Sequence, residues 1–267
     1  MRKILILGGG FGGIRATLDL ERKLKADIKN GQIEITLIDK NNYHLFVPSL
    51  YEVASAMGIK KDPFSVRLRK SICIPHADIF ENKLVNLVQA EIVRVNLVEK
   101  FVQTKGDKRY EFDYLILALG SQSSDYEIRG VKEYAYKFKT LEDALLVNER
   151  METLINDAAN GKRQLPIDIL VGGAGFTGIE MASELACCAK SIAKKCGLKG
   201  KCSSIVLFEA TSKILPTVSD KERKIIVDRL TKHGVMIMEN STIEEVGDNF
   251  VKLKNSQKIK GDLVIWT

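Results

Sequence analysis

The sequence predicts an α/β protein with two similar domains, each built on a parallel sheet, the second inserted in the first. Two glycine-rich loops support this prediction. Gly8–Gly13 follows the apolar run Ile4–Leu7, and Gly173–Gly178 follows Ile169–Val171. Continuous apolar runs of this kind are typical of strands that are buried on both faces of a parallel sheet. Since the same order occurs twice, we expect two three-layer domains of one architecture.

The spacing of the glycines is that of a Rossmann-like dinucleotide-binding loop. In the first loop, Gly8 permits a tight turn, Gly10 lets the backbone approach a pyrophosphate, and Gly13 lets the next helix pack closely. The N–H groups at the start of that helix face the phosphates, and the helix dipole favours their negative charge. The second loop repeats the pattern and leads into a helix expected from Ile179 to Lys195, as the first leads into one from Ile14 to Lys25.

An acidic residue ends the next strand in both repeats. The expected strands are Ile35–Asp39 and Ile205–Glu209, and an acid at this place can accept hydrogen bonds from an adenosine ribose. Both acids lie further from their loops than the usual spacing of about 20 residues. We attribute this to polar connectors at 25–31 and 196–204. The alternative is that the acids only cap or solvate strand ends, but finding the same order twice favours the ribose.

A closing strand completes each repeat. Asp113–Leu117 closes the first and Asp262–Trp266 the second, each being an aspartate followed by an apolar run. The small-residue turn Ala118–Ser121 lets the chain leave one domain for the other. We therefore predict a first domain at 1–120, a second at 121–261, and the start of a return to the first at 262–267.

The other elements follow from local patterns. The connection 41–80 is too long for a simple loop, so we expect it to carry a helix and to cover a ligand. Short alternating strands between 84 and 116 predict an antiparallel insertion that returns to the sheet. Thr140 is a plausible N-cap for an amphipathic helix at Leu141–Ala159. Another helix and three short strands are expected at 220–232, 235–239, 244–246 and 250–253.

Composition is that of an ordinary soluble protein. The chain has 267 residues, of which 45% are hydrophobic and 28% charged, and no apolar stretch is long enough to cross a membrane. The first strand begins at Ile4, which leaves no room for a signal peptide, so we expect a cytoplasmic protein. The net charge is +7, but the lysines are scattered, which favours solvated faces over a nucleic-acid site and leaves a membrane surface as a secondary interpretation.

Five cysteines occur, and none forms a CxxC pair or a metal-type cluster with histidine. We therefore expect reduced thiols and no metal site. Cys187 and Cys188 fall late in an expected helix and are predicted to be packing residues.

The chain resembles the type II NADH dehydrogenases, single-polypeptide NADH:quinone oxidoreductases that belong to the two-dinucleotide flavoproteins related to the pyridine nucleotide-disulfide oxidoreductases. Seven segments carry the resemblance and occur in the expected order. They are Gly8–Gly13, Leu37–Phe46, Tyr51–Ala54, Phe112–Ser121, Phe138–Ala144, Gly173–Glu180 and Val264–Thr267.

The resemblance implies FAD on the first domain and NADH on the second, with hydride passing from nicotinamide to flavin and electrons then passing to a quinone. It places Asp39 and Glu209 on the two adenosine riboses, Ala90 and Glu91 along the adenine of FAD, and Gly120 near the flavin. The implied FAD contacts are Gly8, Gly10, Phe11, Gly12, Gly13, Asp39, Lys40, Ala90, Glu91, Ala118 and Gly120, and the implied NADH contacts are Gly173, Gly175, Phe176, Thr177, Gly178 and Glu209.

Glu180 is the candidate catalytic residue, because the equivalent glutamate of the family lies by the nicotinamide and flavin. The alternative is a first-turn glutamate that the helix dipole favours. His44 and His76 could relay protons, but we expect each to be a packed or hydrogen-bonded histidine.

Two other functions stay open. Disulfide reductases of this fold are excluded because residues 41–72 contain no cysteine. A sulfide:quinone oxidoreductase needs cysteines near the flavin, and Cys73 could be one, although its partner spacing does not fit. The other alternative is a dinucleotide-binding fragment without turnover.

The chain departs from the family in two places. Val47 replaces a glutamine that many relatives carry between the phenylalanine and the proline, which argues against a quinone contact there. Relatives also continue beyond the Trp-Thr segment, so we expect that a C-terminal part is missing, through truncation or through loss from the gene. In the family that part docks on the cytoplasmic face of the membrane. A peripheral membrane contact and a homodimer are therefore open, and no nucleic-acid partner is expected.

Overall fold

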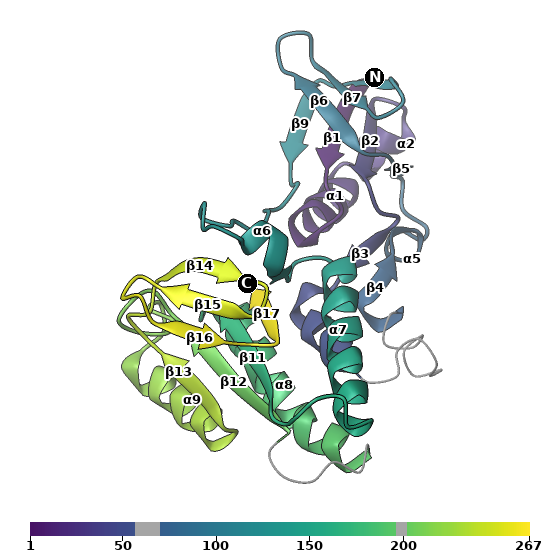
Figure 1. Cartoon of the computed structure of the whole chain (residues 1–267). Helices are drawn as coiled ribbons and strands as arrows, with labels where there is room; N and C mark the ends of the chain where they lie inside the picture. The colour runs from purple at the N-terminus through teal and green to yellow at the C-terminus, as the bar shows by residue number, and fades with distance from the viewer. Residues whose placement is uncertain (57–69, 196–201) are drawn as a thin grey trace. The chain divides into compact units, whose positions relative to one another are not determined.

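The computed structural model describes residues 1–56, 70–195 and 202–267 (Figure 1). Of the polar connector expected at 196–204, residues 196–201 lie outside the described part of the chain. Backbone contacts divide the described chain into two compact units. Of the described residues, unit 1 contains 1–46 and 70–121, and unit 2 contains 47–56, 122–195 and 202–267.

Unit 1 is built on a four-stranded parallel sheet in the order β5-β2-β1-β9. The strand β1 leads through the first glycine loop into α1, which a short helix α2 follows. The bounds are β1 Arg2–Leu7, α1 Phe11–Lys23, α2 Lys25–Lys29, β2 Ile33–Asp39, β5 Asn86–Gln89 and β9 Tyr114–Leu117.

Alternate residues of β1 face two different layers, as the period of a strand requires. Ile4 and Ile6 lie in a buried cluster on the α1 side, whereas Leu5 and Leu7 lie in a second cluster with Val102. That second layer is the antiparallel sheet β6-β7-β8. Unit 1 therefore has three layers. The bounds of the remaining elements are β3 Tyr43–Leu45, β4 Cys73–Pro75, α5 His76–Ile79, β6 Ile92–Asn96, β7 Phe101–Thr104 and β8 Arg109–Glu111.

Unit 2 repeats this plan on a five-stranded parallel sheet in the order β10-β17-β11-β12-β13. The helices α8 and α9 contact its strands. The bounds are β10 Tyr136–Lys137, β11 Ile167–Gly172, α8 Phe176–Lys195, β12 Ser203–Phe208, α9 Asp220–Lys232, β13 Val235–Met238 and β17 Leu263–Trp266.

A second sheet in unit 2, β14-β15-β16, is antiparallel and buries one core with the parallel strands (Figure 1). Leu170, Phe208 and Trp266 come from the parallel strands, and Val246 and Val251 from the antiparallel ones. The helix α3 packs against α7 and α8. The bounds are η1 Val47–Ser49, α3 Leu50–Ser55, α6 Val131–Tyr134, α7 Leu141–Ala159, β14 Ile243–Gly247, β15 Phe250–Leu253 and β16 Lys258–Lys260.

The predicted α/β class with parallel sheets is confirmed, and so are the helices at 141–159 and 220–232. Thr140 caps the first of them in a capping box: its hydroxyl accepts from the Asp143 N–H at 3.1 Å, while the Asp143 carboxylate accepts from the Thr140 N–H at 2.8 Å. The long connection carries α3 and α5, as expected, although residues 57–69 lie outside the described part.

Three details differ from the sequence prediction. The strand at 86–89 pairs in parallel with β2, so the antiparallel insertion begins only at Ile92. Both glycine-loop helices begin three residues earlier than expected, at Phe11 and Phe176, because the last three loop positions are helical. Cys187 is exposed and does not pack in the interior, since it lies off the buried face of α8 that contains Leu185 and Ala186.

Candidate functional site

The first glycine loop lies at the carboxyl end of β1, between the ends of β2 and β9. Gly8 N–H donates to the Ile38 carbonyl at 2.8 Å, and Ala118 N–H donates to the Leu7 carbonyl at 2.8 Å. A Cβ on Gly13 would lie 1.8 Å from the Gly8 carbonyl oxygen. The third glycine is therefore required by the packing of α1 against the turn.

Asp39 reaches back to this loop from the end of β2. Its carboxylate accepts the Gly9 N–H at 2.5 Å and the Asn41 N–H at 2.7 Å. Ala90 N–H donates to the Asp39 carbonyl at 2.8 Å, so Ala90 and Glu91 begin the next segment along the same sheet edge. Ligands of open parallel sheets bind outside the carboxyl ends of the strands, which is where these residues lie.

The phosphate-facing side of the first loop is open. A Cβ on Gly10 would meet nothing within 4 Å, and no side chain caps the start of α1. Phe11 is 53% exposed at the first helical position. Gly12 is exposed too, and so are Lys40 and Gly120, which lie at the ends of β2 and β9. The free helix start and the open glycine fit the pyrophosphate of a dinucleotide.

His44 and His76 are packed beneath the loop, as the sequence predicts. Both rings are buried, with Nδ1 of His44 at 3.3 Å and Nε2 of His76 at 3.2 Å from the Gly9 carbonyl oxygen. Phe11 packs edge-on against His44, with ring centroids 4.5 Å apart. These contacts support the conformation of the turn.

The second loop repeats the hydrogen bonds of the first. Gly173 N–H donates to the Phe208 carbonyl at 3.1 Å, and Thr267 N–H donates to the Gly172 carbonyl at 3.0 Å. A Cβ on Gly178 would lie 1.9 Å from the Gly173 carbonyl oxygen, whereas one on Gly175 would meet nothing within 4 Å. The two units therefore present the same combination of one packed glycine and one open glycine.

The closing aspartates also match. The Asp113 carboxylate accepts the Lys3 N–H at 2.7 Å, and the Asp262 carboxylate accepts the Asp168 N–H at 2.8 Å. Asp262 is also paired with Arg163, whose side chain is three-quarters buried. The repeated aspartate thus holds the start of the closing strand against the first strand of its unit.

Glu209 holds the place of Asp39 in unit 2. Its carboxylate lies 3.3 Å from the Ala174 N–H and 2.9 Å from both the N–H and the hydroxyl of Thr211. It lines a cavity of about 700 Å³ at the carboxyl edge of the parallel sheet, together with Gly173, Gly175 and Trp266. Phe176 and Thr177 begin α8 beside this cavity, Phe176 being 59% exposed.

Ser241 and Thr242 line the same cavity and were not expected from the sequence. Ser241 N–H donates to the Glu209 carbonyl at 2.8 Å, as Ala90 N–H does to Asp39. Lys254 N–H donates to the Thr242 carbonyl at 3.0 Å, which matches the bond from Lys105 to Glu91 at 2.7 Å. Aligning the two repeats through their closing strands would have found these residues.

Glu180 is the fifth residue of α8, in its second turn, so the alternative interpretation as a first-turn glutamate is wrong. Its side chain lines a cavity of about 230 Å³ in unit 2 with Tyr51, Glu184 and Arg229. Desolvation raises the pKa of the Glu180 carboxyl. Burial also raises the pKa of Tyr51, and the neighbouring carboxylates of Glu52, Glu180 and Glu184 add to that rise.

A small polar cluster surrounds Glu184 one turn further along α8. The carboxylate lies 3.1 Å from Sγ of Cys188 and 3.3 Å from Oγ of Ser55. Burial, together with the hydrogen bond to Glu184, raises the pKa of the Cys188 thiol to about 12. This thiol is therefore neutral at physiological pH.

Across the described parts of the chain, His, Cys, Asp and Glu side chains form no group of three that could hold a metal ion. In the same residues, no helix is long and apolar enough to cross a membrane. Cys73 lies on β4 opposite Leu45.

Comparison with known proteins identifies the family. The family described as pyridine nucleotide-disulphide oxidoreductase matches residues 2–267, so the chain belongs to this family. The type II NADH:quinone oxidoreductase of Staphylococcus saprophyticus is 28% identical in sequence over an alignment that covers 99% of the chain. The chain spans 64% of the length of that relative.

Two solved structures share the fold. NDH2 from Plasmodium falciparum in complex with NADH matches the whole chain with a TM-score of 0.82 at 22% identity, and the chain covers 55% of it. The sulfide:quinone oxidoreductase of Aquifex aeolicus matches with a TM-score of 0.77 at 19% identity, and the chain covers 58% of it. These matches confirm an architecture of the FAD- and NAD-binding Rossmann type.

Proposed function

We propose that the chain forms the dinucleotide-binding part of an FAD-dependent NADH:quinone oxidoreductase. The observation that carries this proposal is the pair of equivalent loops, each with an open glycine and an acid at the carboxyl edge of a parallel sheet. The S. saprophyticus relative is named for this activity and matches nearly the whole chain, which supports the same proposal.

In this proposal the first loop holds FAD. Gly10 and the uncapped start of α1 would lie along its pyrophosphate, and Asp39 would bind its adenosine ribose. Ala90 and Glu91 would lie along the adenine, with Lys40, Ala118 and Gly120 nearby. The predicted domains 1–120 and 121–261 belong to this proposal, whereas the residues predicted to return to the first domain at 262–267 contain β17, a strand of the unit 2 sheet.

The second loop would hold NADH. Gly175 would face its pyrophosphate and Glu209 its adenosine ribose, while Ser241 and Thr242 would take the place that Ala90 and Glu91 take in unit 1. A carboxylate at the ribose disfavours the 2′-phosphate of NADPH through like-charge repulsion. The proposal therefore names NADH as the donor.

When bound, the nicotinamide and the flavin supply the hydride-transfer chemistry. The residues of the chain align the two dinucleotides and exclude water, and the hydride step needs no acid or base. Glu180 is proposed to lie by the nicotinamide. Burial raises the pKa of its carboxyl above the ordinary value of a glutamate.

The acceptor is proposed to be a quinone, reached on the cytoplasmic side of a membrane to which the complete protein binds peripherally. Val47 stands where many relatives have glutamine, so we place no quinone contact at this residue.

The test is the flavin spectrum of the purified chain, reconstituted with FAD under anaerobic conditions and mixed with NADH. We expect weak FAD binding and bleaching of the bound flavin by NADH. A protein that binds NADH but no FAD would instead support a dinucleotide-binding fragment without turnover. If adding the C-terminal part of a relative gave no NADH-dependent quinone reduction, the proposed function would be wrong.

Sulfide:quinone oxidoreductase is the second candidate, because the A. aeolicus enzyme shares the fold and Cys73 lies on β4 of unit 1. Sulfide is added in place of NADH in the same anaerobic experiment. Flavin bleaching by sulfide that is lost in Cys73→Ser would favour this candidate, and bleaching by NADH alone would exclude it.

A further inference from the structure

The segment 210–219, between β12 and α9, carries two contacts to the acid of the unit 2 cavity. Thr211 N–H donates to Oε1 of Glu209 at 2.9 Å. The Thr211 hydroxyl lies 2.9 Å from the same carboxylate oxygen and 2.9 Å from the Lys213 carbonyl oxygen. The orientation of the Glu209 carboxylate therefore depends on the conformation of this segment.

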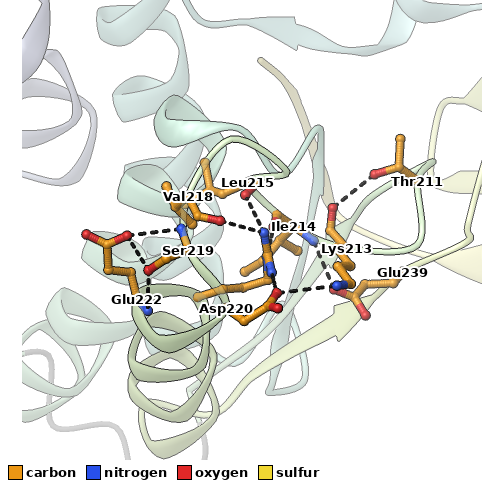
Figure 2. A network of polar contacts seen from close by, with 10 residues as sticks. Thr211, Lys213, Ile214, Leu215, Val218, Ser219, Asp220, Glu222 and Glu239 are labelled. Carbon is orange, nitrogen blue, oxygen red and sulfur yellow. Dashed lines mark hydrogen bonds and ion pairs between the residues drawn. The ribbon is translucent and has the colours of Figure 1, made fainter.

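Arg223, in the first turn of α9, holds the far end of the segment. Its guanidinium donates to three main-chain carbonyls, those of Ile214 at 2.7 Å, Val218 at 2.9 Å and Leu215 at 3.1 Å, and also pairs with Asp220. Figure 2 shows the carbonyls of Leu215 and Val218 turned toward the same guanidinium nitrogen. Arg223 is only 9% exposed. Its planar fork of donors suits several carbonyls at once, which a lysine cannot match.

The middle of the segment is held just as closely. Ile214 N–H donates to the Glu239 carboxylate at 2.9 Å, and Asn240 N–H donates to the Thr211 carbonyl at 2.8 Å. Leu215 has φ of +44°, a left-handed conformation that L side chains rarely adopt. A guanidinium on its carbonyl helps to hold that conformation. An unbroken series of contacts thus runs from Arg223 through residues 215 to 211 to Glu209.

We propose that Arg223 is a positioning residue for nucleotide selectivity: by holding segment 210–219 it fixes Thr211, and through Thr211 the Glu209 carboxylate, against the adenosine ribose. This inference rests on the proposed function, which places NADH in unit 2. A carboxylate held by donors from Ala174 and Thr211 cannot turn away from a 2′-phosphate. Since Coulomb repulsion falls with distance, freeing the carboxylate weakens discrimination.

The test compares ADP-ribose with 2′-phospho-ADP-ribose, which differ only at the 2′ position. Their dissociation constants are measured by calorimetry for the wild-type chain, Arg223→Met and Arg223→Lys. For Arg223→Met we expect about tenfold weaker binding of ADP-ribose and a roughly fivefold or greater loss of preference over the 2′-phosphate form. Arg223→Lys should lie in between, because it keeps the charge but not the fork.

Arg163→Met is the matched control. Arg163 is also a largely buried arginine of unit 2, but its ion-pair partner is Asp262, which lies outside segment 210–219. We expect its melting temperature to fall while both dissociation constants stay at the wild-type values. If Arg223→Met does not fold, Thr211→Val removes the hydroxyl contact without touching α9 and should show the same loss of preference.

Three results would overturn the inference. Arg223→Met or Thr211→Val could keep the wild-type preference while losing only thermal stability, as Arg163→Met does. The wild-type chain could bind ADP-ribose without discriminating against the 2′-phosphate, which would contradict the inference alone. If the wild-type chain bound neither probe, the nucleotide site of unit 2 in the proposed function would fail with it.

Discussion

At the scale of single residues, the open and the packed glycines of each loop have separate tasks. Gly178 lies under the Gly173 carbonyl, and Gly175 faces open space. Both positions are glycine, yet only the first is required for folding. The glycine spacing predicts this distinction from the sequence, since the second glycine of the motif allows ligand approach and the third allows close helix packing.

We predict that Gly178→Ala destabilises the chain by about 2 kcal/mol or more, because the added Cβ would overlap a main-chain oxygen at 1.9 Å. Helix propensity alone would make the alanine variant more stable, since it favours alanine over glycine by roughly 1 kcal/mol. Gly175→Ala should change stability by less than about 0.5 kcal/mol. Urea unfolding measures both, and equal stability of the two variants would contradict this interpretation of the loop.

The adjacent thiols Cys187 and Cys188 should differ in reactivity. The thiolate is the form that alkylating agents attack, and the pKa of Cys188 is raised to about 12, so this thiol stays protonated as the pH rises to 9. Cys187 is exposed on the same helix and serves as an internal control. We expect iodoacetamide at pH 9 to label Cys188 at least about tenfold more slowly, as followed by peptide mass spectrometry. Equal labelling rates would show that Cys188 is not protected.

Arg223 shows why a residue can escape sequence analysis. Its partners are main-chain carbonyls, so no complementary side-chain pattern marks it. Ser241 and Thr242 were missed because no motif marks them, and only an alignment of the two repeats relates them to Ala90 and Glu91. The glycines could be found because turn geometry restricts the residue types at those positions, and the two acids because each ends the strand that follows its loop in both repeats.

At the scale of elements, local signals predicted the helices well. The helix α7 has a capping residue at Thr140 and acids in its first turn, and its bounds agree with the prediction. The strand β5 was assigned to the wrong sheet because a short alternating strand does not reveal its partner. The starts of α1 and α8 were placed late, because helical glycines look like loop residues.

The capping box of α7 gives a prediction at this scale. Thr140→Ala removes an acceptor for the Asp143 N–H and should lower the free energy of unfolding by about 1 kcal/mol. Thr153→Ala is the control, since Thr153 is exposed on the same helix and alanine is the better helix former. Urea midpoints measure both, and a control that loses as much stability as Thr140→Ala would contradict the capping argument.

At the scale of the whole chain, the two units are one plan used twice. The order β5-β2-β1-β9 in unit 1 corresponds to β13-β12-β11-β17 in unit 2, and the hydrogen bonds at the carboxyl edges correspond as well. This repeat could be predicted from the sequence because the glycine loops, the acids and the closing strands recur in the same order. The packing of α3 in unit 2 could not, since nothing in the sequence marks where that segment docks.

The central claim is that the first loop takes FAD and the second takes NADH. The most direct test measures the binding of each dinucleotide to the wild-type chain, Gly10→Val and Gly175→Val. Both substitutions place the new side chain where a Cβ meets no protein atom within 4 Å, so folding should be preserved. We predict that Gly10→Val loses FAD but keeps NADH, and that Gly175→Val loses NADH but keeps FAD. If either variant lost both dinucleotides while staying folded, or lost neither, the assignment of one dinucleotide to each loop would be contradicted.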